Sequence, residues 1–572
     1  MHHRYSAAFI GLLGLCACST AADDDLEVDP AAVKLDTLVV GVKVDPNDLL
    51  SPLAQSAFDL SLLDLIGAKP LKAEFDCELR FLPDYASSYA WSEDGKSMTL
   101  ELREDLAWSD GAPVVPRDLS LLAELIRDPA VGSLRSGNLA LLTPESPVLL
   151  DPHHLRYDFT TRGDRTVMTA NTTLLQLVPS HILADPSAER AAIRSHTLNT
   201  TSPLSSGRWM MTAWEKGKSV TLEPNPKYPG PPPGLARVVF RILPEYAARL
   251  LELQQGRIDL MEAVQVADAD ALVQEHPEIK LHTRGYRGQD YVGWNSIDPA
   301  AWKAELAAGH KPDPAKMPPH PLFANVEVRR ALSMAVDVSR IIADVLTSKA
   351  SGKAYAVRSV STITPELCAS RENGIIPLNY DVEGARAALA RAGWTDTNGD
   401  GVIDRDGVPF RFTAIMPLGS ARHLLVSAIL QEQWKAIGVD AQFESIAGGA
   451  MGERLRRRDF DAALTGWSAG LWVDPTTVLG RTSESNFFSY QNPKAQALID
   501  EGVRESSPTR ANEIWNEFQR VVYDDQPYTF LYWLDEIVAV NGRFENTDVG
   551  LISPFNKLEG WTVAPDKVKY KQ

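Results

Sequence analysis

A short apolar run from Ala7 to Ala17 follows a basic start at Arg4 and limits what the rest of the chain can be. Eleven helical residues span about 16 Å, roughly half of a bilayer core, so the run is typical of a signal peptide rather than of a transmembrane helix. No later segment approaches 18 consecutive apolar residues. The remainder is therefore expected to bury its apolar residues in a soluble, exported body.

The apolar run ends in Leu15-Cys16-Ala17-Cys18, which resembles the bacterial lipobox. Small Ala17 before Cys18 favours Cys18 as the lipidated residue, and residues 1–17 are then a lipoprotein signal peptide. An ordinary signal peptide with two incidental cysteines stays open. Residues 18–35 are small, acidic and aperiodic, which predicts a flexible tether. We expect a periplasmic protein of the cell envelope, lipid-anchored to a bacterial membrane, inner or outer.

The composition excludes several classes of protein. Of 572 residues, 44% are hydrophobic and 23% are charged, as in ordinary soluble proteins. The formal net charge of −18 argues against nucleic acid as a partner, because an acidic surface repels phosphate. The length suggests three or four domain-sized units.

Local patterns alternate between strands and helices. Asp36–Val44 is a compact β-branched strand, and alternation in Met98–Leu102 predicts another after the Asp94-Gly95 turn. Asp118 is expected to cap a helix whose apolar face includes Leu119 and Leu122, and Asp337 and Ser420 are expected to cap two later helices. The helix before Asp337 is expected to place Val328, Leu332 and Ala335 on its core face.

Several longer stretches occur in a characteristic order. They are FLPDYASSYAWSEDGKSMTLELREDLAWSDGAPVVPRDLSLLAELI from Phe81, VPSHI from Val178, SSGRWMMTAWEKGKSVTLEPNPKY from Ser205, LLELQQGRIDLMEAV, FANVEVRRALSMAVDVSRI from Phe323, YDVEGARAALARAGWTDTNGDGVIDRDG, and GWSAGLWVD from Gly466. This order resembles the family 5 extracellular solute-binding proteins, which are the dipeptide- and oligopeptide-binding proteins of ABC importers. The resemblance covers about 500 residues.

The resemblance implies an α/β fold of the two-lobed periplasmic-binding-protein class, a clamp with mixed sheets flanked by helices. Lobe I would comprise 36–285 plus 516–572, with 72–200 as an inserted subdomain. Lobe II would comprise 286–515. Ligand would lie between the lobes, which close by a hinge motion.

The ligand site is expected near the segment GWSAGLWVD, which crosses the cleft in the family. Many peptide-binding members carry an Asp three residues after the Trp, where it pairs with the peptide amine; here that position is Gly470, and Asp474 could substitute. The candidate ligand-binding residues are Trp467, Ser468, Ala469, Gly470, Trp472, Asp474, Trp294, Asn295 and Tyr490. Core packing is the alternative for Trp467 and Trp472.

The sequence predicts neither an enzyme nor a cofactor. It contains no HExxH, Walker A or GxSxG motif, and its histidines suggest no metal site. Asp396, Asn398, Asp400 and Gly401 fit the start of an EF-hand loop, but Gly407 stands where the bidentate Glu is needed, so we predict no metal.

Cys77 and Cys368 lie 291 residues apart in a compartment that permits disulfides. Their pairing cannot be deduced from spacing, so a disulfide and two buried free thiols both stay open.

We therefore expect a monomeric substrate-binding lipoprotein that captures peptides or peptide-sized solutes and delivers them to ABC permease and ATPase subunits. One alternative is the same fold binding an oligosaccharide or a metal chelate. Another is a sensory or exported lipoprotein that is not coupled to import. The identity and length of the ligand stay open.

Overall fold

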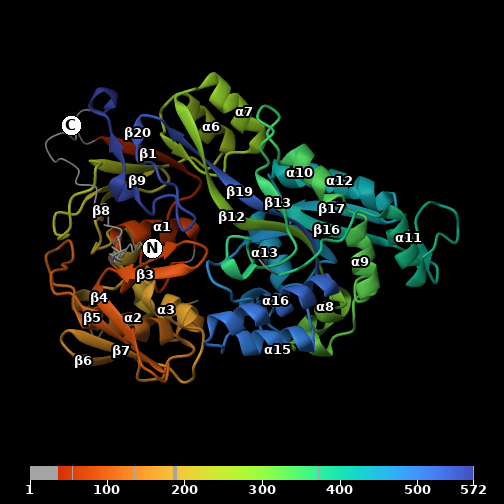
Figure 1. Ribbon diagram of the computed structural model, residues 1–572, viewed down its shortest axis with the longest axis horizontal. Helices are drawn as coiled ribbons and strands as arrows, with labels where there is room; N and C mark the ends of the chain where they lie inside the picture. The colour runs from red at the N-terminus through yellow and green to blue at the C-terminus, as the bar shows by residue number, and fades with distance from the viewer. Residues whose placement is uncertain (1–35, 55, 134, 185–189, 371–372, 571–572) are drawn as a thin grey trace, which may run out of the picture.

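The structure is a computed structural model that describes residues 36–54, 56–133, 135–184, 190–370 and 373–570. Its largest element is a mixed sheet of eleven strands (Figure 1). Across the sheet the strands are β17 (Asp440–Ile446), β16 (Arg411–Pro417), β18 (Ala462–Ser468), β12 (Ile279–Trp294), β19 (Tyr528–Asn541), β11 (Leu260–Met261), β1 (Thr37–Val42), β10 (Arg237–Ile242), β9 (Ser219–Pro224) and β8 (Trp209–Glu215); β13 (Ala356–Arg358) also pairs with β19.

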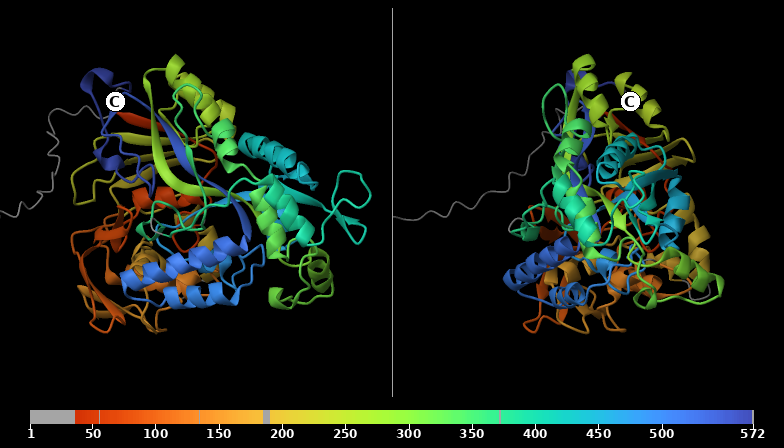
Figure 2. Two further views of the ribbon diagram at one scale, coloured as in Figure 1. Left: turned by 45° about the vertical axis from the view of Figure 1, so that its right-hand side comes forward. Right: turned by 90° about the vertical axis from the view of Figure 1, so that its right-hand side faces the viewer.

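Two long antiparallel strands, β12 and β19, connect the two halves of this sheet (Figures 1 and 2). The register of their pairing shifts between Thr283 and Tyr286 and again between Tyr286 and Gly288, and there is a further shift between Asp290 and Tyr291. Interrupted pairing bends and twists a strand pair locally. The irregular stretch therefore lies where the chain passes from lobe I to lobe II.

Lobe I is built around β1, which pairs in parallel with both β10 and β11. Its core joins both ends of the chain, because Val40 and Phe240 pack in one cluster with Val538 and Trp561. Helices α1 (Ala57–Ile66), α6 (Tyr246–Gln254) and α7 (Val266–Glu275) and the short strands β20 (Phe544–Glu545) and β21 (Thr562–Val563) complete this lobe.

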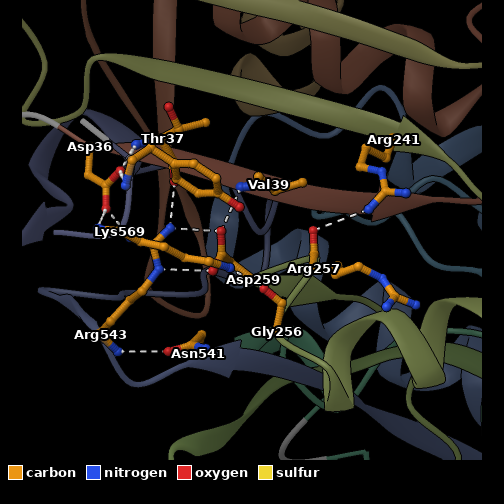
Figure 3. A network of polar contacts seen from close by, with 11 residues as sticks. Asp36, Thr37, Val39, Arg241, Gly256, Arg257, Asp259, Asn541, Arg543 and Lys569 are labelled. Carbon is orange, nitrogen blue, oxygen red and sulfur yellow. Dashed lines mark hydrogen bonds and ion pairs between the residues drawn. The ribbon is translucent and has the colours of Figure 1, made fainter. Parts of the chain in front are cut away.

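A buried ionic cluster holds the two ends of lobe I together (Figure 3). Arg543 pairs with Asp36 and Asp259, and it also donates to Thr37 O. Asp36 in turn accepts the backbone N–H of Lys569 at 2.8 Å. The cluster thus ties the first strand of the lobe to the last residues that the structure describes.

The subdomain has a separate four-stranded sheet of β4 (Ala86–Trp91), β5 (Ser97–Leu102), β7 (His154–Asp158) and β6 (Val148–Asp151). Trp108, Leu122 and Tyr157 belong to its own hydrophobic core. The helices α2 (Pro116–Arg127), α3 (Arg165–Thr173), α4 (Ser180–Leu183) and α5 (Thr197–Thr200) and the hairpin of β2 (Leu71–Phe75) and β3 (Leu79–Pro83) accompany this sheet.

Lobe II has two hydrophobic cores, one centred on Trp294 and Trp434 and one on Trp515 and Phe518. Its helices are α8 (Pro299–Ala307), α9 (Val326–Met334), α10 (Val338–Val345), α11 (Val382–Arg391), α12 (Ala421–Lys435), α13 (Gly448–Arg456), α14 (Thr476–Leu479), α15 (Pro493–Gly502) and α16 (Pro508–Asp525), and it also contains the hairpin of β14 (Asp404–Arg405) and β15 (Val408–Pro409).

The packing of α16 differs from the expected division at residue 516, which falls inside this helix. Ile514 and Phe518 share one core with Leu498 and Ile499 of α15, so the whole helix packs in lobe II. The chain therefore passes back from lobe II to lobe I within β19, near Asp535, which pairs with Tyr286 of β12. The reason is that α16 is amphipathic over its full length and buries one continuous face.

The helix starts show which local predictions hold. Ser420 caps α12 and accepts the His423 N–H, and Asp337 caps α10, as the sequence predicts. Asp118 also caps its helix, as predicted, but from the third helical position, because α2 begins earlier, at Pro116, a residue type suited to the first helical position. Its side chain is fully buried and accepts hydrogen bonds from the N–H of the N-cap residue Val115, from Trp108 Nε1 and from Ser180 N.

A disulfide joins Cys77 to Cys368. Cys77 lies in the turn between β2 and β3 of the subdomain, whereas Cys368 belongs to a loop of lobe II. The bond is therefore a third connection between the lobes, in addition to β12 and β19. It also decides between the two alternatives that the sequence left open.

Among the described residues, no helix is long and apolar enough to cross a membrane. Cys18, the signal peptide and the tether lie outside the described residues.

Candidate functional site

A cavity of about 1180 Å³ lies between the lobes. Lobe I contributes the end of β1, the start of α1 and the loop after β11, including Val42, Ser61 and Glu262. Lobe II contributes Arg422 at the start of α12 and the segment after β18. The strands β12 and β19, which cross between the lobes, form the wall between these two sides. The cavity is therefore lined by both lobes, whose relative position a hinge motion would change.

Part of the segment from Trp467 to Asp474 lines the cavity. Ser468, Gly470 and Trp472 line it. A Cβ atom on Gly470 would meet Trp472 O at 3.5 Å, which is an ordinary contact, so packing does not require glycine here. The wall therefore has room for a side chain that the sequence does not supply.

The other candidates in this segment lie beside the cavity rather than on its wall. Trp467 Nε1 donates to Gln289 Oε1 at 2.9 Å, and its ring packs against the core of lobe II. Ala469 is buried and donates to Arg287 O. Asp474 Oδ1 accepts the Thr476 N–H at 3.0 Å, at the start of α14. Asp474 thus makes a local turn contact just before α14 and is not among the lining residues.

Trp294, Asn295 and Tyr490 are core residues in this structure. Trp294 is 0% exposed and packs against Phe323, and Asn295 donates to Phe460 O at 2.9 Å. The Tyr490 hydroxyl donates to Asp525 at 2.6 Å. Trp294 and Asn295 lie at the end of β12 and Tyr490 lies in the loop before α15, and all three side chains enter the core of lobe II, so the structure does not bring them to the cavity.

Charged residues on the crossing strands form the part of the site that sequence reasoning missed. Arg284 Nη1 on β12 lies 3.1 Å from Glu262 Oε2 and 3.2 Å from Glu536 Oε2 on β19. Burial raises the pKa of Glu262 to about 7, and the like charge of Glu536 adds to this effect, whereas Arg284 opposes it. These residues come from three chain segments, and no spacing in the sequence links them.

A second charged group positions Arg422 on the wall. Its Nε donates to Asp290 Oδ2 at 2.8 Å, and the Tyr532 hydroxyl donates to the same oxygen. Burial opposes ionisation of Asp290, but Arg422 and His423 outweigh it and hold the pKa of Asp290 below its usual range. Arg422 is therefore held in place by an ionised carboxylate behind it.

The described residues contain no group of three or more His, Cys, Asp or Glu side chains that could hold a metal ion. In the turn that resembles an EF-hand, the Asp396 carboxylate accepts the backbone N–H groups of Gly399 and Gly401. These are contacts within the turn itself.

Residues 80–489 match the family model of bacterial extracellular solute-binding proteins, family 5. The chain belongs to this family. The predicted membership and the two-lobed α/β fold are thereby confirmed.

Relatives within family 5 extend over most of the chain. The probable D,D-dipeptide-binding periplasmic protein DdpA of Escherichia coli is 23% identical over 523 residues, which cover 89% of this chain and 91% of that protein. The oligopeptide-binding protein AppA of Bacillus subtilis, solved in complex with a nonapeptide, superimposes with a TM-score of 0.76 at 22% identity over 93% of this chain and 100% of that one. NikZ of Campylobacter jejuni, solved with Ni(L-His), has the same TM-score at 19% identity and the same coverage.

Proposed function

We propose that this family 5 protein is the substrate-binding lipoprotein of an ABC importer, which captures peptides or peptide-sized solutes between its lobes and delivers them to a membrane permease. The supporting observation is the cavity of about 1180 Å³ between the lobes. It exceeds the roughly 300–1,000 Å³ typical of small-molecule sites. Relatives named for dipeptides and solved with a nonapeptide support the peptide class.

In this proposal the protein performs no covalent chemistry, and binding energy drives closure of the lobes. Ser468, Gly470 and Trp472 contact the solute from the lobe II side. The decisive experiment is mass spectrometry of the solute that copurifies with the protein, followed by binding of the identified compound. Copurified peptides would support the peptide class.

A non-peptide solute is the second candidate, since NikZ is solved with Ni(L-His) and another structural neighbour is named as an EDTA-binding protein. A copurified chelate or oligosaccharide would favour it. A sensory role without import is tested by the neighbouring genes, because an importer needs permease and ATPase subunits.

We also propose that Cys18 carries the lipid anchor of a monomeric, periplasmic protein. Cys18→Ala should abolish lipid labelling and leave the protein unprocessed or free of the membrane. Unchanged labelling and membrane fractionation of this variant would contradict the anchor.

A further inference from the structure

The cavity wall has a charge opposite in sign to that of the whole protein. Ten lysine and arginine side chains line it against seven aspartate and glutamate side chains, although the chain carries a net charge of −18. Some of these cations are neutralised from behind, as Arg422 is by Asp290 and Lys557 by Asp548. The cations that remain available to a bound solute are those that have no carboxylate partner.

Four lining arginines are held by backbone carbonyl oxygens, and none of them forms an ion pair within the described part of the chain. They are Arg135, Arg208, Arg249 and Arg287. A carbonyl oxygen accepts a hydrogen bond without carrying a formal charge, and guanidinium groups stay protonated in proteins. Each of these arginines therefore keeps its positive charge while its position is restricted.

Arg287 is the most central of the four, because it lies on β12 where the chain crosses between the lobes. Its Nε donates to Ala469 O at 3.1 Å, and its Nη1 donates to Leu551 O at 3.2 Å and Ile552 O at 3.3 Å. These contacts fix the guanidinium beside Gly470, where the wall has no side chain. Within the described residues, no hydrogen bond occupies its Nη2.

The acidic side chains near Arg287 do not cancel its charge. Glu262 and Glu536 both contact Arg284 through one carboxylate oxygen each. The raised pKa of Glu262, about 7, makes this group partly neutral near neutral pH. Asp535, also on the wall, accepts the Gly285 N–H. The strands β12 and β19 thus present the Arg287 guanidinium to the cavity, whereas the nearby acidic side chains already contact Arg284 or a backbone N–H.

We propose that the cavity selects solutes that carry several carboxylates and a net negative charge, and that Arg287 binds one of these carboxylates. The inference rests on the proposed function and names the solute class of that same site. An arginine held in place presents its N–H groups to a carboxylate with little further ordering, which favours paired hydrogen bonds. Acidic peptides and polycarboxylate chelates share this chemistry.

The test compares matched solutes by calorimetry on the full-length protein. One pair is a nonapeptide library with glutamate at three positions and the same library with glutamine there. The third probe is Fe(III)–EDTA. We expect the glutamate library or Fe(III)–EDTA to bind at least tenfold more tightly than the glutamine library, and more weakly as salt rises.

Arg287→Gln should reduce the preference for the acidic solutes at least tenfold, and Arg287→Lys, which keeps the charge, should retain only part of that preference. Arg457→Gln is the matched control, because Arg457 is exposed on lobe II away from the cavity and loses the same charge. The comparison of probes in the wild-type protein keeps the test valid if Arg287→Gln fails to fold.

The outcomes separate this inference from the proposed function. If both libraries bind equally and Fe(III)–EDTA does not bind, the proposed preference for anionic solutes is wrong. Peptide binding itself is then supported. Fe(III)–EDTA binding without any peptide binding supports the anionic class and contradicts the peptide class. A preference that survives unchanged in Arg287→Gln overturns the role of Arg287. If no probe binds, the anionic class and peptide capture both fail.

Discussion

Arg543 and Asp259 lie 284 residues apart in the chain and form a two-point ion pair, with Nε to Oδ1 and Nη2 to Oδ2 both at 2.9 Å. The Asp259 side chain is completely buried, and that of Arg543 is 9% exposed. The same guanidinium contacts Asp36 at the start of lobe I. One side chain from the C-terminal region thus pairs with two buried carboxylates (Figure 3).

Replacing Arg543 by alanine should destabilise the protein strongly, because Asp36 and Asp259 would remain buried without their cation. Loss of one partner of a buried pair costs about 3–5 kcal/mol. Denaturant unfolding followed by tryptophan fluorescence measures this change. Arg411→Ala is the control, since the Arg411 side chain is 61% exposed in its pair with Asp440, and exposed pairs contribute about 0–1 kcal/mol. Equal losses in the two variants would contradict the assigned role of the buried cluster.

Replacing both Cys77 and Cys368 by serine should lower the free energy of unfolding by about 2–5 kcal/mol, because the disulfide closes a long loop in the unfolded chain. The ligand-free variant should also open more widely, giving a larger radius of gyration in solution scattering. Dithiothreitol should reproduce both effects in the wild type and change nothing in the variant. An unchanged radius of gyration in the variant would show that the bond does not restrict the lobes.

A bound solute should stabilise the closed arrangement of the lobes. The gain follows RT ln(1 + [L]/Kd), or about 2.7 kcal/mol at 100 times Kd, and should raise the melting temperature with concentration. Solution scattering should show a smaller radius of gyration with solute than without. A confirmed solute that changes neither quantity would contradict a closing clamp.

If the protein binds peptides, acetylation of the peptide N-terminus should change affinity less than about tenfold, or roughly 1.4 kcal/mol. The physical reason is that Gly470 offers no carboxylate, and Asp474 contacts the Thr476 N–H outside the cavity wall. Calorimetry with free and acetylated forms of one peptide measures the difference.

Two variants sharpen this comparison. The Cβ of Gly470→Asp would make only ordinary contacts, and this variant should create a preference for the free amine, whereas Asp474→Asn should leave the ratio unchanged. A loss far above tenfold on acetylation in the wild type would reveal an amine anchor. If that loss vanished in Asp474→Asn, Asp474 would be the anchor.

The stability of the ligand-free protein should depend on pH through Glu262. Its folded pKa of about 7 lies above the ordinary value of 4.5, so between these pH values the folded state holds a proton that the unfolded state has lost. The free energy of unfolding therefore falls as pH rises through this range. Arg284 and Glu536 are the charged groups that face Glu262.

Glu262→Gln should remove this decrease and be more stable relative to the wild type at pH 8 than at pH 5. Unfolding in urea at both pH values measures the effect. Glu275→Gln, an exposed position on α7, is the matched control and should keep the decrease. Parallel pH profiles for the wild type and Glu262→Gln would contradict the assignment.

Local chemistry allowed several elements to be predicted from sequence. Ser420 and Asp337 cap helices because their side chains accept nearby backbone N–H groups, which depends on a few neighbouring residues. Val328, Leu332 and Ala335 are buried as their helical spacing predicts. Asp118 caps its helix from the third helical position because Pro116 starts the helix earlier.

The site was predicted only where it is continuous in the chain. Ser468, Gly470 and Trp472 form one short segment and reach the cavity together. Trp294 and Arg287 lie on the same strand, but Trp294 enters the core of lobe II and Arg287 faces the cavity. The sequence of β12 does not show which of its polar side chains reach the cavity, because that depends on where the strand crosses between the lobes.

The position of β19 has a consequence for how the protein is made. This strand lies between β12 and β11, so the two halves of the large sheet stay unjoined until it is in place. A chain that emerges with its N-terminus first would expose the unpaired edges of β11 and β12 while it waits, and such edges promote aggregation. Biogenesis of both lobes thus depends on a strand that emerges after the other strands of the large sheet. Truncation before Tyr528 should yield an aggregating polypeptide rather than an isolated lobe.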